Sequence, residues 1–434
     1  MSELDVLLSE SLPSGWHVST LAKSLIGSDI RNSIDPGDFP TETFDYYSIP
    51  AYQEYGTPVE ETGARILSQK LVVDLGDVLF CKLNPRVPKI WRVTRPSSLR
   101  KVTSTEFLVL TADPSCIDST FLYYLVQSDY VLPRAQTLVT GSTPSRQRVD
   151  RDGFFDIQVP LPALPEQRRI AAVLNTIQDA IAAQEDVIAA AKEFKWSLMH
   201  RLFTVGPGRE LAPTKETLFG DVPAHWGCVV LDHCAEVQTG LAKGRRYRPD
   251  EKTVTLPYLR VANVQDGYLD LSEIKTVEIR EDEVDRYRLE PGDMLMTEGG
   301  DFDKLGRGFI WDGSIADCLH QNHVFAVRAD RARLMPEFLA YLAQSAYGKG
   351  YFLSVAHRTT NLASINSTKL KALPVLLPSL EEQSEVVNIL QVTDAKIAAE
   401  EDRLTAMQAL FKSMLHQLMT GQIRLLSDEG LPLA

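Results

Sequence analysis

A long segment without internal proline or glycine, residues 165–204, constrains this chain more than any other feature. Pro165 stands where the first turn of a helix tolerates proline, so the segment predicts one helix of about eleven turns. Apolar residues recur in it every seven positions, which is the pattern of a coiled-coil seam with a polar centre. The two ladders are Ile170, Ile177, Gln184, Ala191 and Leu198, and Leu174, Ile181, Ile188, Lys195 and Leu202.

The same helix occurs a second time, because adding 216 to each residue number leads without a gap to residues 381–420. Gln167 becomes Gln383 and His200 becomes His416, and we expect the repeated histidines to serve packing or partner contact. The second pair of ladders is Val386, Thr393, Glu400, Met407 and Met414, and Leu390, Ile397, Leu404, Phe411 and Leu418. A repeat of this length predicts two copies of one structural unit.

The regions outside the helices repeat as well. Trp16 and Trp226 stand in matching openings, Gly76-Asp77 is echoed by Gly292-Asp293, and the helical spacing of residues 121–130 recurs at 338–347. Segments 154–162 and 372–378 read as last strands, and each region of roughly 160 residues is long enough for its own core. The sequence therefore predicts two similar mixed α/β domains, an α+β architecture with a circular pseudo-two-fold repeat. The expected boundaries are domain 1 at 1–160, a helical spacer at 161–206, domain 2 at 207–375, a second helical spacer at 376–422 and a tail at 423–434.

Chain geometry predicts that the two helices run antiparallel. A helix of about 38 residues is about 57 Å long, so parallel helices would separate the two ends of the second domain by that distance. Domains usually have neighbouring termini, which favours the antiparallel pair. That pairing sets Gln184 opposite Glu400, whereas parallel helices would set Ile170 beside Val386.

The formal net charge of −13 argues against nucleic-acid binding, because phosphates attract Lys and Arg. Residues 82–101, however, contain seven basic residues and no acid, which predicts a basic surface in the first domain. Five cysteines without a CxxC pair disfavour both a disulfide framework and a zinc site. Apolar runs are too short to span a membrane and the N-terminus lacks a signal-peptide pattern, so we expect a cytoplasmic protein.

An enzyme has little support in this sequence. Residues 84–87, Asn-Pro-Arg-Val, lack the second proline and the aromatic residue of an adenine methyltransferase motif, and no P-loop is present. Glu273-Ile274-Lys275 follows Asp266 and Asp270 with a nuclease-like spacing, but such charges are common on exposed strands. We therefore expect no catalytic residue and no metal ligand.

Loops that combine basic and amide side chains with Gly, Ser or Thr are the candidate DNA-contacting segments. Arg and Lys bind phosphates or guanine edges, and Asn and Gln can read adenine. In the first domain the candidates are Lys82, Asn84, Arg86, Lys89, Arg146, Gln147 and Arg148. In the second domain they are Lys243, Arg245, Arg246, Arg260, Asn263, Lys304, Arg307, Gln321, Asn322, Arg358 and Asn361.

Taken together, these repeated features resemble the specificity subunit of type I restriction-modification systems. The resemblance rests on the doubled long-helix segments, the Trp16 and Trp226 openings, residues 76–86 (GDVLFCKLNPR) and residues 140–149 (TGSTPSRQRV), and covers essentially the whole chain. It implies a non-catalytic subunit whose two target-recognition domains read the halves of a bipartite, asymmetric DNA site while the helices space them.

The resemblance also implies partners. These are double-stranded DNA, two methyltransferase subunits docked on the helices, and two restriction or translocase subunits. S-adenosylmethionine, ATP and Mg²⁺ would lie on those partners, with no cofactor in this chain. Val173, Val187, Phe194 and Trp196 lie off the central seam and form the expected docking surface. The alternative is a protein-binding scaffold in which the coiled coil is an oligomerisation rod.

Overall fold

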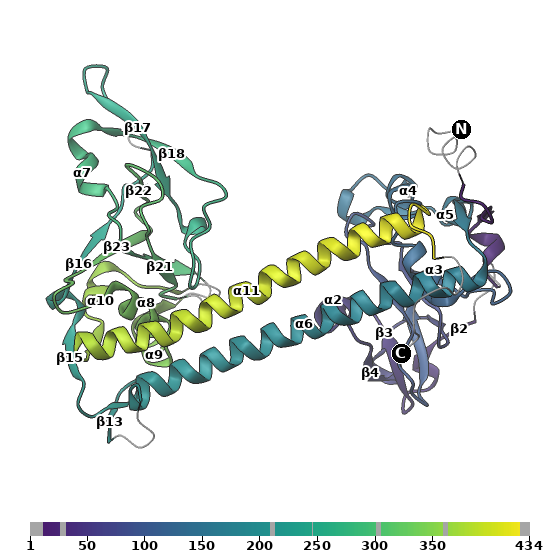
Figure 1. Cartoon of the computed structure of the whole chain (residues 1–434), viewed down its shortest axis with the longest axis horizontal. Coiled ribbons are helices and arrows are strands. Elements are labelled where there is room, and N and C mark those ends of the chain that lie inside the picture. Colours follow the sequence, from purple (N-terminus) through teal and green to yellow (C-terminus); the bar gives the residue numbers. More distant parts are fainter. Residues whose placement is uncertain are drawn as a thin grey trace. The chain divides into compact units, whose positions relative to one another are not determined.

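The chain forms two compact α/β units in the computed structural model, which describes residues 12–26, 32–208, 213–244, 246–300, 305–358 and 363–425. The first unit comprises residues 1–185 and 402–434, and the second comprises residues 186–401 (Figure 1). Each unit contains one globular part together with part of each long helix, α6 (Leu164–Val205) and α11 (Leu380–Met419). Both helices therefore begin and end within one residue of the predicted positions.

The first unit holds two larger sheets and two strand pairs. One sheet has the order β7-β6-β9 and is antiparallel, and all four residues of its central strand β6 are buried. The other has the order β2-β5-β8-β3-β4, in which β3 and β8 run parallel. The strands are β1 (His17–Thr20), β2 (Ser33–Ile34), β3 (Thr43–Tyr47), β4 (Val59–Thr62), β5 (Lys70–Val72), β6 (Val78–Cys81), β7 (Ile90–Arg92), β8 (Arg100–Ser104), β9 (Phe107–Leu110), β10 (Val139–Thr140), β11 (Arg148–Val149) and β12 (Gln158–Leu161). The shorter helices are α2 (Ile49–Glu54), α3 (Ser119–Leu125), α4 (Leu132–Thr137) and α5 (Arg151–Phe155).

The second unit repeats this plan with additions. Its strands are β13 (Thr214–Thr217), β14 (Gly220–Pro223), β15 (Gly227–Val230), β16 (Ala235–Thr239), β17 (Thr253–Leu259), β18 (Lys275–Arg280), β19 (Met294–Thr297), β20 (Gly299–Gly300), β21 (Gly308–Ile310), β22 (Leu319–His320), β23 (Val324–Ala329), β24 (His357–Arg358), β25 (Ala363–Ser364) and β26 (Pro374–Leu377). The shorter helices are α7 (Val284–Tyr287), α8 (Pro336–Gln344), α9 (Ala346–Val355) and α10 (Ser367–Lys371). Pairing β1·β12 is matched by β15·β26, and parallel pairing β3·β8 by β17·β22. In place of the three-stranded sheet stands β16-β23-β19-β21.

The repeated Gly-Asp pair starts the central strand of each unit. Gly76 and Gly292 adopt φ values of 92° and 94°, which favour glycine. The buried carboxylate that follows closes the turn, since Asp77 Oδ2 accepts from the Asp74 N–H at 2.9 Å and Asp293 Oδ2 from the Glu290 N–H at 2.8 Å. The repeated pair thus precedes a buried strand in each unit, and the shared turn geometry explains why it repeats.

Two expected elements are shorter than predicted. Phe154 and Phe155 end helix α5 instead of opening the last strand, because Asp150 caps this helix by accepting from the Gly153 N–H at 2.8 Å. Helix α3 ends at Leu125, whose carbonyl accepts a 2.6 Å hydrogen bond from the Ser128 hydroxyl. Local hydrogen bonds of polar side chains therefore override the apolar pattern at these ends.

The repeated glutamine at the start of each long helix is a buried anchor. The Gln167 amide nitrogen donates to the Cys116 and Pro162 carbonyls at 3.0 and 2.9 Å, and its oxygen accepts from the Asp118 N–H at 2.9 Å. Gln383 makes the same three bonds, donating to Arg333 and Pro378 at 2.8 and 3.0 Å and accepting from Met335 at 2.8 Å. Each amide ties the helix start to the loop before α3 or α8.

Within each unit the two long helices run in opposite directions. In the first unit, Ile170 near the start of α6 shares a core with Leu418 near the end of α11. In the second, Leu202 near the end of α6 shares a core with Val386 near the start of α11. Ile170 and Val386 thus lie in the cores of different units, which confirms the antiparallel prediction. The pairing of Gln184 with Glu400 would join the two units and stays a prediction.

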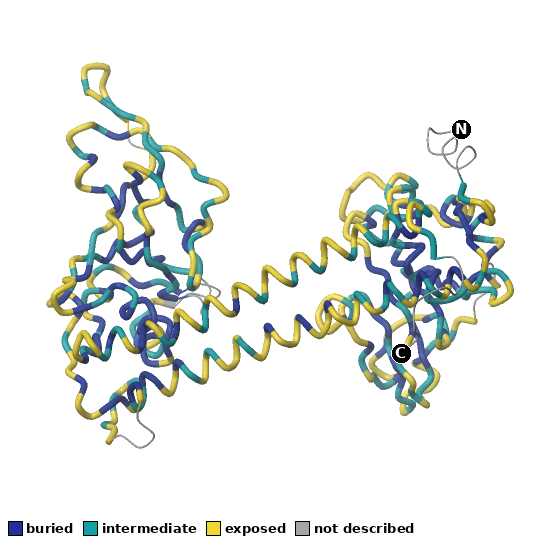
Figure 2. Tube along the Cα trace, viewed as in Figure 1, coloured by how far each residue is buried: buried dark blue, intermediate teal, exposed yellow. Residues whose placement is uncertain are grey.

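The heptad ladders form the covered side of the helices. Every ladder position of α6 and α11 is buried or half-buried, and the positions between them are mostly exposed, as the alternating colours of Figure 2 show. Lys195, a polar ladder position, is paired with Asp394 at 2.5 Å within the second unit. No helix in the described ranges is long and apolar enough to cross a membrane.

Candidate nucleic-acid interface

Two candidate segments of the first unit, distant in sequence, lie side by side. The Asn84 N–H donates to the Gln147 carbonyl at 2.8 Å, and the Val149 N–H donates to the Lys82 carbonyl at 3.0 Å. An antiparallel bridge joins Leu83 to Arg148 between them. The segment that follows β6 is therefore hydrogen-bonded to the β10–β11 hairpin. These bonds place the two predicted DNA-contacting loops of the first unit next to each other.

The candidate side chains of these two loops differ in whether they are exposed or already bound to other groups of the protein. Arg86 and Arg146 are exposed, whereas Lys89 is buried and its ammonium donates to the Val87 carbonyl at 3.0 Å. The Arg148 guanidinium binds both carboxylate oxygens of Glu106, with Nε–oxygen distances of 3.2 and 3.0 Å. Its hydrogen bonds hold the pKa of Glu106 below the usual range. Arg86 and Arg146 are therefore the cations best placed to meet phosphates.

The basic run 82–101 does not form the continuous basic surface that the sequence predicted. Strand pairing β3·β8 and β3·β4 brings acids of distant segments alongside it. Arg95 pairs with Glu60 and with the buried Asp45, at 2.5 and 3.5 Å, and Arg100 pairs with Glu42 at 3.2 Å. The second half of the run is thus neutralised, because acids that are remote in sequence become neighbours in the sheet.

The second unit contains the same backbone frame. The Glu298 N–H donates to the His323 carbonyl at 2.9 Å, and the Ile365 N–H donates to the Glu298 carbonyl at 2.8 Å. Strand β20 pairs with β25, which forms a hairpin with β24. In the first unit the corresponding bonds run from Lys82 to Glu106 at 2.8 Å and from Val149 to Lys82 at 3.0 Å. A hairpin docked on the end of the central strand is therefore common to both units.

A cavity of about 500 Å³ opens beside the hairpin of the second unit. Its lining includes Glu298, Gly300, His323, His357 and Ser364. The His323 ring nitrogen Nδ1 lies 2.5 Å from a Glu298 carboxylate oxygen. Gly299 and Gly300 hold the positions that Leu83 and Asn84 hold in the first unit, and a Cβ at Gly299 would lie 2.8 Å from the Ala363 carbonyl oxygen of β25.

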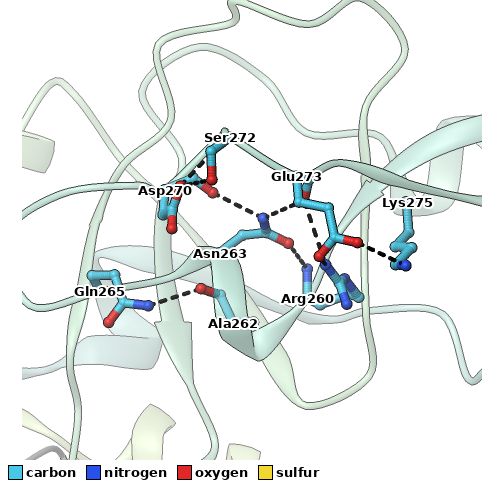
Figure 3. A network of polar contacts seen from close by, with 8 residues as sticks. All are labelled: Arg260, Ala262, Asn263, Gln265, Asp270, Ser272, Glu273 and Lys275. Carbon is cyan, nitrogen blue, oxygen red and sulfur yellow. Dashed lines mark hydrogen bonds and ion pairs between the residues drawn. The ribbon is translucent and has the colours of Figure 1, made fainter. Parts of the chain in front are cut away.

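The candidates Arg260 and Asn263 belong to an internal network (Figure 3). Asn263 is buried; its amide donates to the Asp270 and Glu273 carbonyls at 2.8 and 3.0 Å and accepts from the Arg260 N–H at 2.9 Å. The Glu273 carboxylate pairs with Arg260 at 3.0 Å and with Lys275 at 2.8 Å. The Asn263 amide thus links the backbone of residues 260, 270 and 273. Glu273 forms ion pairs with Arg260 and Lys275 and is not part of a nuclease-like cluster of carboxylates.

Other candidates of the second unit fall into four groups. Lys243 and Arg246 are exposed, and the backbone N–H groups of Gln321 and Asn322 bond to Leu259 and Leu241 at 2.9 and 3.0 Å. Arg307 contacts the Gln265 side chain and the Val261 carbonyl at 3.4 and 3.3 Å. Arg245, Lys304, Asn361 and the side chain of Arg358 lie outside the described residues.

Glu106, Glu298 and His323 occupy the frame but were not among the predicted site residues. Carboxylates were passed over because phosphate repels them. The signal that could have found them is the repeat itself, because Lys82 and Glu298 stand at equal distances after the Gly-Asp pair. Aligning the two copies shows the positions at which the backbone is the same but the side chains differ in charge.

The expected docking surface on the helices is only partly available. The side chains of Val187, Phe194 and Trp196 are 47, 62 and 59% exposed. Val173 instead packs against the core of the first unit and is half-buried, which corrects its placement on a free face. Trp196 stacks on His200, with ring centres 5.9 Å apart.

Each unit holds one copy of the same α/β frame with polar residues at a docked hairpin, so the chain is a repeat protein with one candidate site in each unit. Residues 225–408 match the family described as the type I restriction modification DNA specificity domain. This match and several curated specificity subunits confirm the predicted resemblance to the specificity subunits of type I restriction-modification systems.

Named relatives share sequence similarity with this chain, and solved structures share its fold. The chain is 28% identical over 207 residues to the putative MjaX specificity subunit of Methanocaldococcus jannaschii, covering 48% of each. It is 25% identical to the StySPI specificity subunit of Salmonella potsdam, covering 71% of this chain and 66% of the relative. It therefore spans about half to two thirds of the length of these relatives. Its fold is similar to that of a chain from a solved type I restriction-modification system, with a TM-score of 0.59 at 21% identity over 95% of this chain and 100% of that one. The type I S subunit of M. genitalium is similar at a TM-score of 0.50 and 13% identity over 94 and 97% of the two chains.

Proposed function

We propose that this chain is the DNA sequence-recognition subunit of a type I restriction-modification complex and is itself non-catalytic. Each unit would bind one half of a bipartite, asymmetric site, and the helices would set the spacing. The observation that carries the proposal is the shared frame, in which one backbone arrangement presents Lys82, Glu106 and Arg148 in one unit and Glu298, His323 and Ser364 in the other. A constant scaffold with variable polar ends suits the reading of two different half-sites.

The proposed partners are duplex DNA, two methyltransferase subunits and two restriction subunits. Exposed apolar side chains on the long helices, such as Trp196 on α6 and Val392 on α11, support docking there because a monomer gains nothing by leaving them in water. S-adenosylmethionine, ATP and Mg²⁺ would be bound by those partners.

The test is duplex DNA binding by the chain assembled with its methyltransferase subunits. Arg86→Ala and Arg146→Ala should each weaken binding to one half-site, by about 1–3 kcal/mol for a base-edge contact. A phosphate contact would instead lower the salt slope by about one. Arg65→Ala is the matched control, since Arg65 is an exposed arginine of the same unit remote from the hairpin in sequence.

If the chain is instead a protein-binding scaffold, we expect no binding to duplex DNA. Phosphate contacts make affinity fall steeply with salt concentration, whereas a scaffold shows no duplex binding and no slope. The absence of measurable duplex DNA binding by the assembled complex at low salt would therefore refute the recognition function.

A further inference from the structure

Three positions of the shared frame carry different hydrogen-bonding groups in the two units. The backbone bonds place Glu298 where Lys82 stands, His323 where Glu106 stands, and Ser364 where Arg148 stands. The first unit carries two cations around one carboxylate. The second unit carries one carboxylate, Glu298, at the position of Lys82 and not at the position of Glu106. His323, at the position of Glu106, contacts the Glu298 carboxylate.

These side chains are not needed to hold the frame. The Arg148–Glu106 pair is 51 and 27% exposed, and the His323–Glu298 pair is 54 and 34% exposed. Exposed ion pairs contribute little to stability, whereas the backbone bonds recur in both units whatever the side chains are. The three positions are therefore free to vary with the ligand.

Their chemistry points to different base edges. Lys and Arg donate to the O6 and N7 acceptors of guanine, whereas a Glu carboxylate accepts from an exocyclic amine such as cytosine N4. In the second unit the carboxylate of Glu298 lines an open cavity, and His323 holds one of its oxygens in place. A group that enters this cavity meets an acceptor that the first unit lacks at that position.

We propose that positions 82/298, 106/323 and 148/364 determine sequence specificity. Glu298, oriented by His323, selects a base bearing an exocyclic amine in the half-site of the second unit. Lys82 selects guanine at the equivalent step of the other half-site, and Arg148 holds the Glu106 carboxylate beside it. This inference rests on the proposed DNA-recognition function and assigns the residues that carry it.

The experiment selects bound duplexes from a randomised pool with the full chain assembled with its methyltransferase subunits. We expect the wild-type complex to enrich a bipartite motif with cytosine or adenine at one position of one half, and the enriched base distinguishes the two. Glu298→Gln, close in size, should reduce that preference about tenfold and leave the other half-site unchanged. Glu298→Lys, which copies the first unit, should shift the preference toward guanine.

The control is Glu236→Gln, an exposed carboxylate on β16 of the same unit, which should leave the motif intact. An unchanged motif with both Glu298 variants overturns the inference while DNA recognition stands. If the Glu298→Lys chain does not assemble with the methyltransferase subunits, the motif enriched by the Glu298→Gln complex alone tests the inference. A wild-type complex that enriches no motif overturns the proposed function, and this inference with it.

Discussion

Acid should weaken the second unit through one buried histidine beneath the candidate recognition loop. His320 on β22 is fully buried; its Nδ1–H donates to the Val324 carbonyl at 2.7 Å, and Nε2 has no partner within the described residues. Burial lowers its pKa to about 4, against about 6.5 in an unfolded chain. The neutral ring therefore contributes stability that is fully present above pH 6.5 and is lost as the pH falls toward 4. Between pH 7 and pH 5 the loss is about 2 kcal/mol.

The assay is urea unfolding of the full chain at pH 7 and pH 5, compared with His320→Asn. Asparagine can keep a donor for the Val324 carbonyl but does not titrate. The variant should be less stable at pH 7 because it leaves a void, yet its second unit should lose about 2 kcal/mol less than wild type on acidification. Carboxylates with lowered pKa, such as Asp270 and Glu273, titrate below this window. Equal losses in wild type and variant would refute the assignment of a buried neutral ring.

Two further predictions concern the long helices. Gln383→Ala removes three hydrogen bonds and leaves the buried Pro378 carbonyl without this donor, so it should lower the free energy of unfolding by about 3 kcal/mol in urea titrations. The exposed neighbour Glu385→Ala should change it by less than about 0.5 kcal/mol. Trp196→Glu should release the methyltransferase subunit in co-purification without unfolding the chain, whereas Ser197→Glu, which adds the same charge at the next exposed position, should retain it. Co-purification that survives Trp196→Glu would place docking elsewhere.

The sequence predicted those parts of the fold that depend on periodicity. The heptad ladders and the 216-residue repeat were sufficient to predict the long helices and the presence of two similar units, and the helix length was sufficient to predict that the helices run in opposite directions. Site residues were harder to predict because their environment comes from strands distant in sequence. The basic run 82–101 predicts a surface of cations, but β3 places Asp45 beside Arg95. Asn263 was read as a loop amide, but the turn at Asp270 folds back over it. Glu298 was missed because its significance lies in the contrast with Lys82 across the repeat.

The first unit is completed by the last residues of the chain. Arg424 Nε and Nη2 bind the carboxylate of Glu166 at 2.7 and 3.0 Å, and Arg424 Nη2 donates to the Ser14 carbonyl at 3.0 Å. Leu418 lies fully buried in the same core as Trp16. On the ribosome the second unit, residues 186–401, is one continuous stretch and can close as soon as it emerges. The core of the first unit, although its first residues are synthesised earlier, lacks Leu418 until that residue has been made, so we expect the first unit to fold after the second.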